Sequence, residues 1–327
     1  MSGPIMTKLK MLSPESKDKL KSKSHMFVKL FIFFFGLLLG AYINHYGYLL
    51  NDIRVDMPIE TCRQRFEVSA TFNIKGCDDY MIPNIVHYIW FGQNKTMTFV
   101  QFLSILSAYK VQQPDSIYLH CNNLPIGYWW TELRKQVPII KILPREPPET
   151  IFGQRLMHTY HKGDVAKLQV LMQYGGIYLD YDIIVLKNLN ALRKYEITLG
   201  QEIKTDKLNA GFIAAHKDAL FLRLSYDAYK DQYQPVIWDY NCASVPFAIY
   251  KKHPGLVHVE PSRLTSPGWN ARHLIWKGLI DWSDFYVMHL MMHFNWDEFD
   301  PDSIRTLNTT FGQITRYIYY GSKKLLK

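Results

Sequence analysis

The sequence predicts an α/β fold built on a mostly parallel sheet that helices flank. Apolar runs of strand length alternate with helical segments from about residue 82 onward. The chain has 327 residues, which is enough for a sizeable buried core. Its hydrophobic content of 48% and charged content of 20% are typical of a folded protein. Together these features favour one folded α/β domain over a disordered or fibrous chain.

The first strand is predicted at residues 84–90 (NIVHYIW), a β-branched and aromatic run that ends before Gly92. A helix is expected over 98–110, and two further strands over 116–120 and 137–143. This strand–helix–strand alternation is typical of a parallel sheet, whose ligands bind at the carboxyl ends of the strands.

The central segment runs from residue 164 to residue 182. Apolar residues at helical spacing follow Asp164, which can cap the start of a helix. Gly175 and Gly176 are expected to end this helix, because glycine readily adopts the left-handed closing conformation. A short buried strand at 177–179 then leads directly to Asp180 and Asp182.

The later elements are less regular. The sequence predicts strands at 197–202, 211–215 and 256–259, helices at 221–229 and 242–250, and no definite assignment for the aromatic-rich segment 269–296.

The net charge of +9 is concentrated at one end of the chain. Residues 1–29 carry seven lysines and two acidic residues, and residues 30–50 carry no formal charge. The remainder holds 31 basic and 27 acidic residues. Because most of the excess lies in a short tail, we expect no nucleic-acid partner.

Residues 30–50 are predicted to be a single-pass membrane anchor. A helix of these 21 uncharged residues would span about 30 Å, the thickness of a bilayer core. The preceding lysines place the N-terminus in the cytosol and the C-terminal part in the lumen. A cleaved signal peptide is the alternative, but the long basic lead favours a retained anchor. Gly36 and Gly40 have a spacing that allows two such helices to pair as a homodimer.

Two sequons and the cysteines agree with a luminal domain. Asn94 and Asn308 each begin an Asn-x-Thr glycosylation motif. All four cysteines follow residue 50, where disulfides can persist. Cys62 with Cys77 is the favoured pair, although three pairings remain open. The predicted parts are a cytosolic tail at 1–29, an anchor at 30–50, a stem at 51–80, a folded domain at 81–310 and a C-terminal tail at 311–327.

Asp180 and Asp182 carry the strongest chemical signal. In an extended segment residues i and i+2 point to the same side, so the two carboxylates converge. Such a pair suits a hard divalent ion, Mn²⁺ or Mg²⁺, which can bridge a diphosphate and stabilise its departure. A solvated turn is the alternative, but the preceding helix, paired glycines and apolar strand favour a built site.

Four segments together resemble a known family. Residues 164–168 and 174–182, with the opening 82–92 and the later 209–212, resemble the sugar-transfer family that contains a DXD motif. Its members include alpha-1,4-galactosyltransferases, alpha-1,4-N-acetylglucosaminyltransferases and fungal initiating mannosyltransferases. The resemblance implies a GT-A fold, transfer with retention, and a nucleotide-sugar donor, with a UDP-sugar favoured over GDP-mannose. We expect a glycan or glycolipid acceptor and, from the predicted anchor and its orientation, a Golgi membrane enzyme with a luminal catalytic domain.

The resemblance also implies roles for individual residues. Asp182 is the expected direct metal ligand, and Asp180 is expected to bind metal-linked water or the donor. Trp90 matches an aromatic residue that stacks on the nucleotide base, with a core tryptophan as the alternative. Asp164 matches a carboxylate that binds hydroxyl groups of the donor sugar. Lys167 occupies a position that is often arginine in the family, and lysine lacks the planar fork of arginine.

A late histidine completes the expected site. The segment 286–293 (YVMHLMMH) resembles the family's return to the donor pocket, with His289 as the expected metal or diphosphate ligand and His293 in reserve. A buried structural histidine is the alternative.

Two other function classes compete with sugar transfer. An inactive luminal glycan-binding protein of the same fold would not need the intact Asp180 and Asp182 pair. A metal-dependent phosphotransferase or hydrolase would need further motifs, and the sequence has no nucleophile elbow or phosphate-binding Gly-Lys-Ser loop. Trp129, Trp130, Trp238 and Trp269 could stack on an acceptor sugar, with core packing as the alternative for each.

Overall fold

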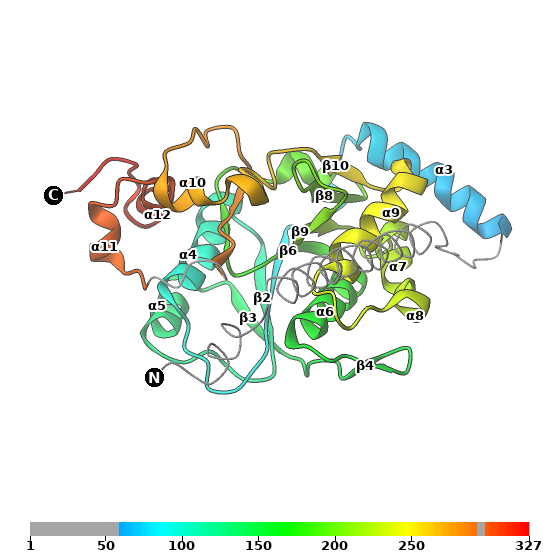
Figure 1. Ribbon diagram of the computed structural model, residues 1–327, viewed down its shortest axis with the longest axis horizontal. Helices are drawn as coiled ribbons and strands as arrows, with labels where there is room; N and C mark the ends of the chain where they lie inside the picture. Colours follow the sequence, from blue (N-terminus) through cyan, green and yellow to red (C-terminus); the bar gives the residue numbers. More distant parts are fainter. Residues whose placement is uncertain (1–58, 293–297, 327) are drawn as a thin grey trace, which may run out of the picture. The chain divides into compact units, whose positions relative to one another are not determined.

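The computed structural model describes residues 59–292 and 298–326, all of which lie in the compact unit Arg54–Lys327 (Figure 1). The predicted cytosolic tail at 1–29 and the predicted anchor at 30–50 fall outside the described residues. Within the described part of the chain, no helix has the length and apolar character needed to cross a bilayer. The membrane anchor therefore stays a prediction from the sequence.

A seven-stranded sheet forms the centre of the domain, in the order β10-β8-β9-β6-β1-β2-β3. In chain order these strands are β1 (Ile85–Trp90), β2 (Ser116–Cys121), β3 (Ile140–Pro144), β6 (Gly176–Leu179), β8 (Ile197–Gln201), β9 (Leu208–Ala215) and β10 (His258–Glu260). Strand β1 is parallel to both of its neighbours, β2 and β6. The β2–β3 and β8–β10 pairs are also parallel, whereas β9 is antiparallel to both β6 and β8. The predicted mostly parallel sheet is confirmed.

Helices cover the sheet in two groups (Figure 1). One group holds α4 (Phe99–Ser107), α5 (Tyr128–Gln136), α10 (His273–Lys277) and α12 (Thr310–Tyr320), and the other holds α6 (Thr159–Tyr174), α7 (Leu220–Asp227) and α9 (Val245–Lys252). Helix α4 illustrates why the segments fold as they do. A reciprocal capping box between Thr98 and Gln101 fixes its start, and nearly all of its side chains are buried in the core.

The remaining described elements are short apart from α3. They are α3 (Ile59–Lys75), a hairpin of β4 (Thr150–Ile151) and β5 (Gln154–Arg155), a ladder of β7 (Ile183–Val185) and β11 (Val287–His289), α8 (Tyr229–Gln232), α11 (Pro301–Arg305) and several single helical turns.

The start of helix α6 differs from the prediction. The helix begins at Thr159, so Asp164 lies inside it and the interpretation of Asp164 as a helix cap is wrong. Thr159 and Tyr160 are exposed, and burial begins at His161. Because the first turn is exposed, the apolar pattern of the sequence reveals only the later, buried part of the helix.

The folded unit extends beyond the predicted stem and tail boundaries. Helix α3 lies within the segment 51–80, which was expected to have little regular structure. It docks through Ser69 and Asn73, both of which donate hydrogen bonds to the buried carboxylate of Glu196. Burial raises the pKa of Glu196. At the other end, α12 packs Phe311 and Ile314 into the core, past the predicted boundary at residue 310.

The structure describes the side chains of three of the four cysteines. Cys77, Cys121 and Cys242 form no disulfide with one another, and the side chain of Cys62 lies outside the described part of the structure.

Candidate active site

Two glycines place the central strand. Gly175 and Gly176 have φ values of 65° and 109°, which favour glycine. A Cβ atom on Gly176 would lie 2.6 Å from the carbonyl oxygen of Ile85 and 2.7 Å from Nε2 of His87. Only glycine therefore lets the chain leave α6 and enter the sheet directly beside β1. The buried strand β6 then ends at Leu179, immediately before the two aspartates.

The two aspartates lie on a turn rather than on an extended strand. The amide of Ile183 donates to the carbonyl oxygen of Asp180 at 3.1 Å, which closes the turn. The Tyr178 hydroxyl donates to Asp180 Oδ1 at 2.6 Å, and the amide of Met292 donates to Asp182 Oδ2 at 3.0 Å. The expected extended geometry is thus wrong in detail, yet both carboxylates face the same space.

His289 reaches the aspartates through a strand pairing that is distant in sequence. Strand β11 runs antiparallel to β7 with His289 opposite Ile183, the residue after Asp182. Nε2 of His289 lies 3.2 Å from Asp182 Oδ1. One ligand atom from each of Asp180, Asp182 and His289 lies within 4.8 Å of the others, so these three residues could hold a metal ion. The reserve candidate His293 lies outside the described residues.

The electrostatics of this triad set the charge of the histidine. Burial disfavours the imidazolium form of His289, but the nearby carboxylates of Asp182, Asp180 and Glu202 together outweigh burial and raise the pKa of His289 to about 9. At neutral pH the imidazole is therefore protonated in the absence of a metal ion.

Metal binding by His289 should consequently depend on pH. A metal ion on Nε2 must displace the proton, so we expect the affinity for Mn²⁺ to rise about tenfold per pH unit up to about pH 9 and to fall as the pH drops. Mn²⁺ titrations between pH 6.5 and 8.5 measure this slope. The variant His289→Gln should bind Mn²⁺ weakly with a flat profile. A flat profile in the wild-type protein would remove His289 from the ligand set.

Lys167 and Asp164 form a buried ion pair on α6. Lys167 Nζ lies 2.9 Å from Asp164 Oδ1 and 3.9 Å from Asp180 Oδ1, and it donates to the carbonyl oxygen of Ala210. Burial opposes the charge of Lys167, but the two carboxylates hold its pKa above the ordinary value. The lysine therefore stays charged and helps to orient Asp180, one member of the metal triad.

Trp90 lies in the core rather than on the surface of the site. Its side chain is 4% exposed and packs edge-on against Tyr181, with ring centroids 5.1 Å apart. Its indole nitrogen is buried and has no hydrogen-bond partner among the described residues. This placement fits the core alternative better than stacking on a base.

The variant Trp90→Ala should accordingly lose stability rather than nucleotide affinity. Truncation of a buried tryptophan typically costs about 3–5 kcal/mol of unfolding free energy. Urea unfolding measures this loss, and Trp90→Phe serves as a milder variant for nucleotide titrations. A large loss of nucleotide affinity in Trp90→Phe at unchanged stability would restore the base-stacking role.

Two cavities meet at the metal triad. The larger cavity has a volume of about 940 Å³, and the smaller cavity has a volume of about 330 Å³. The residues that line both are Asp164, Lys167, Asp180 and Trp238. Asp182 faces the larger cavity and His289 the smaller one. Both volumes fall within the usual range for small-molecule sites.

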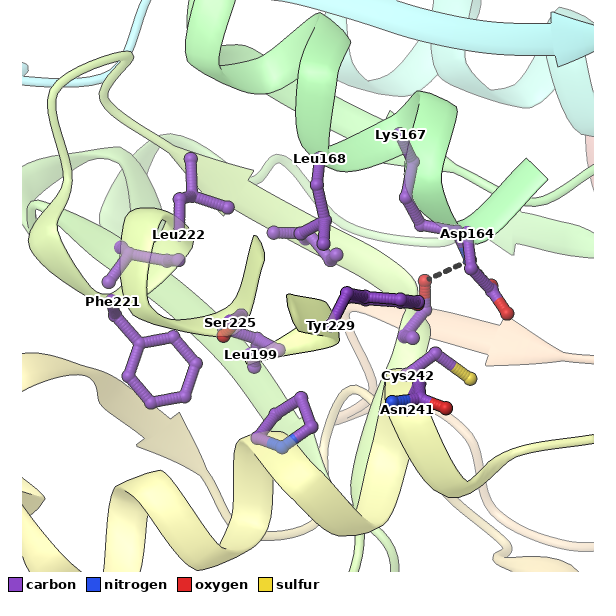
Figure 2. A pocket seen from close by; sticks show the side chains of 14 residues that line it. Asp164, Lys167, Leu168, Leu199, Phe221, Leu222, Ser225, Tyr229, Asn241 and Cys242 are labelled. Atoms are coloured by element: carbon purple, nitrogen blue, oxygen red, sulfur yellow. Dashed lines mark hydrogen bonds and ion pairs between the residues drawn. The ribbon is translucent and has the colours of Figure 1, made fainter. Parts of the chain in front are cut away.

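A third, apolar cavity of about 20 Å³ lies beside Asp164 and Lys167 (Figure 2). It is too small for a sugar, and its wall includes Leu168, Phe221 and Leu222. We assign it to packing behind the ion pair.

The sequence did not identify Glu202 as a site residue. Glu202 accepts a hydrogen bond from Asn209 at 2.9 Å, and Asn209 in turn lies 3.2 Å from Nδ1 of His289. Asn209 belongs to the segment 209–212 that resembles the family, but no role for its side chain is predicted from the sequence. The sequence feature that could have pointed to Glu202 is its position at the end of the predicted strand 197–202, where a carboxylate can face a ligand.

The region around these residues is similar in sequence to known proteins. Residues 86–198 match the sequence model described as "Glycosyltransferase sugar-binding region containing DXD motif". "Glucan organizing enzyme 1" of Cryptococcus neoformans is 28% identical over 261 residues, which cover 72% of this chain and 70% of that protein. The "Lactosylceramide 4-alpha-galactosyltransferase" of Pongo pygmaeus is 26% identical over 154 residues, which cover 45% of this chain and 63% of that enzyme.

A solved structure of the glycosyltransferase GlyE from Streptococcus pneumoniae matches with a TM-score of 0.45 at 12% identity, over 72% of this chain and 60% of that chain. The sequence matches confirm the family resemblance and the prediction of a glycosyltransferase. Residues 86–198 of this chain are thus similar to that sugar-binding region, and Asp180-Tyr181-Asp182 is the Asp-x-Asp sequence within them.

Proposed function

We propose that this protein transfers a hexose from a nucleotide-sugar donor to a hydroxyl group of a glycan or glycolipid, with the help of a divalent metal ion. The observation that carries the proposal is the convergence of Asp180, Asp182 and His289 where two cavities meet. A metal ion held there would stand between a nucleotide in one cavity and a sugar in the other.

The side chains of the triad fit such an ion. Two carboxylate oxygens and one imidazole nitrogen suit Mn²⁺, and the carboxylates also suit Mg²⁺. When bound, the ion would neutralise the charge that develops on the leaving diphosphate. The protein holds the ligands in place, because Tyr178 and Lys167 orient Asp180 and the Met292 amide orients Asp182.

The larger cavity is the better place for the nucleotide. It reaches Ile89 near the carboxyl end of β1, which is where nucleotides bind to parallel sheets. Trp129, Tyr160 and Tyr181 offer aromatic surface for the base in its wall. A UDP-sugar is the favoured donor and GDP-mannose the alternative, and transfer with retention follows from the family resemblance.

A donor panel tests the proposal. The full chain in detergent is incubated with UDP- and GDP-sugars and Mn²⁺, with and without oligosaccharide acceptors. Chelator-sensitive formation of a glycoside supports the proposal. Donor binding without turnover indicates an inactive glycan-binding protein, and turnover to free sugar that acceptors never redirect indicates a hydrolase. The anomeric configuration of the product, read by NMR, tests retention.

A secretory-pathway location is also part of the proposal, as a single-pass Golgi membrane protein with a luminal catalytic domain. It rests on the predicted anchor at 30–50 and on the sequons at Asn94 and Asn308, both of which are exposed. We expect the protein from cells to lose apparent mass on treatment with an N-glycosidase, and the double variant Asn94→Gln/Asn308→Gln to show no such shift. Digestion of the catalytic domain by protease added to intact microsomes would contradict this topology.

A further inference from the structure

One wall of the smaller cavity carries the Glu202 carboxylate, of which only one oxygen accepts a hydrogen bond within the described residues. Glu202 follows strand β8, and its backbone is fixed by hydrogen bonds to Thr205 and Lys207. Its Oε1 atom accepts a hydrogen bond from Asn209 Nδ2. Its Oε2 atom is buried and has no hydrogen-bond partner among the described residues. Such an acceptor is costly unless water or a ligand donates to it.

The lysines of this cavity already have carboxylate partners. Lys207 Nζ lies 2.5 Å from Asp239 Oδ2, and Lys167 is paired with Asp164. The four carboxylates that line the cavity, Asp164, Asp180, Glu202 and Asp239, outnumber its two lysines. Asp180 belongs to the metal triad, so Glu202 is the carboxylate left to meet a ligand. The unpaired Oε2 atom of Glu202 disfavours an acidic group beside it and favours a neutral ligand that brings hydroxyl donors.

The rest of the wall suits the apolar face of a sugar ring. Trp238 and Trp269 both line the smaller cavity, and Trp238 is 50% exposed. Aromatic rings next to hydrogen-bonding carboxylates match a pyranose, which has C–H faces and a rim of hydroxyl groups.

We propose that Glu202 accepts a hydrogen bond from a hydroxyl group of a neutral sugar bound in the smaller cavity, and so contributes to substrate selection. The inference rests on the proposed function and adds a sugar contact to it. The sugar could belong to the donor or to the acceptor, and the two sources are separable by experiment.

The test compares Glu202→Gln and Glu202→Ala with Asp206→Asn. Asp206 is exposed in the same turn and does not line the smaller cavity, so its variant removes one negative charge without touching the site. Dissociation constants are measured in Mn²⁺ for UDP-galactose against UDP and for GDP-mannose against GDP. The Michaelis constant for lactose is measured as the acceptor arm.

A donor-sugar contact should weaken binding of the nucleotide sugar by about tenfold or more in both Glu202 variants, with unchanged binding of the free nucleotide. An acceptor contact should instead raise the Michaelis constant for lactose by a similar factor. Asp206→Asn should match the wild type in every assay. Because Glu202→Gln keeps the size of the side chain, the same assays can be made with this variant alone if Glu202→Ala folds poorly.

The proposal is overturned if the Glu202 variants leave all these constants unchanged, or if they weaken free nucleotide and nucleotide sugar equally. These outcomes are distinct from failure of the proposed function, which would appear as absence of metal-dependent transfer in the wild-type protein itself.

Discussion

Asp182→Ala is expected to lower the rate of sugar transfer by about 10³-fold or more, which corresponds to about 4 kcal/mol of transition-state stabilisation. The variant removes one carboxylate of the metal triad and the acceptor for the Met292 amide. Because the residue lies on a turn after strand β6, we expect the fold to survive.

Initial rates at saturating Mn²⁺ and donor measure this loss, with the melting temperature recorded alongside. Asp182→Asn is the matched control, since it keeps an oxygen for the Met292 amide but removes the charge, and it should be nearly as inactive. Transfer near the wild-type rate in either variant would place the metal elsewhere.

Lys167→Met is expected to destabilise the protein by about 3–5 kcal/mol, because it leaves a buried carboxylate without its cationic partner. The side chains of Lys167 and Asp164 are only 6% and 10% exposed, and the same ammonium group lies near Asp180. Urea unfolding measures the change in unfolding free energy.

The double variant Asp164→Asn/Lys167→Met provides the control for this prediction. Removal of both charges should recover a substantial part of the lost stability, since no unpaired charge remains at position 164. If the single variant loses less than about 1 kcal/mol, or if the double variant is no more stable than the single one, the ion pair does not stabilise the folded state as we describe.

Local patterns were enough to predict the parts of the site that depend on adjacent residues. The apolar run of β1, the glycine pair and the short strand before Asp180 each have a signature within a few residues. They placed the aspartates at a strand end correctly, although the turn that closes between Asp180 and Ile183 was not foreseen.

Site residues that lie far from the two aspartates in the sequence cannot be predicted from local patterns. The pairing of β11 with β7 puts His289 beside Asp182, about a hundred residues away, and no periodicity encodes it. Only the family resemblance pointed to His289. Glu202 was missed because its significance lies in a buried, unpaired oxygen. A core tryptophan and a stacking tryptophan look alike in a sequence, so the sequence alone leaves both roles open for Trp90.

Titration of the full chain with Mn²⁺, followed by the EPR signal of the unbound ion, tests the central claim most directly. The account predicts one site in the wild-type protein, tighter in the presence of the donor's parent nucleotide diphosphate, and weakened at least about tenfold in both Asp182→Ala and His289→Ala. Mn²⁺ binding that is absent from the wild type, or that is unchanged in both variants, would contradict it.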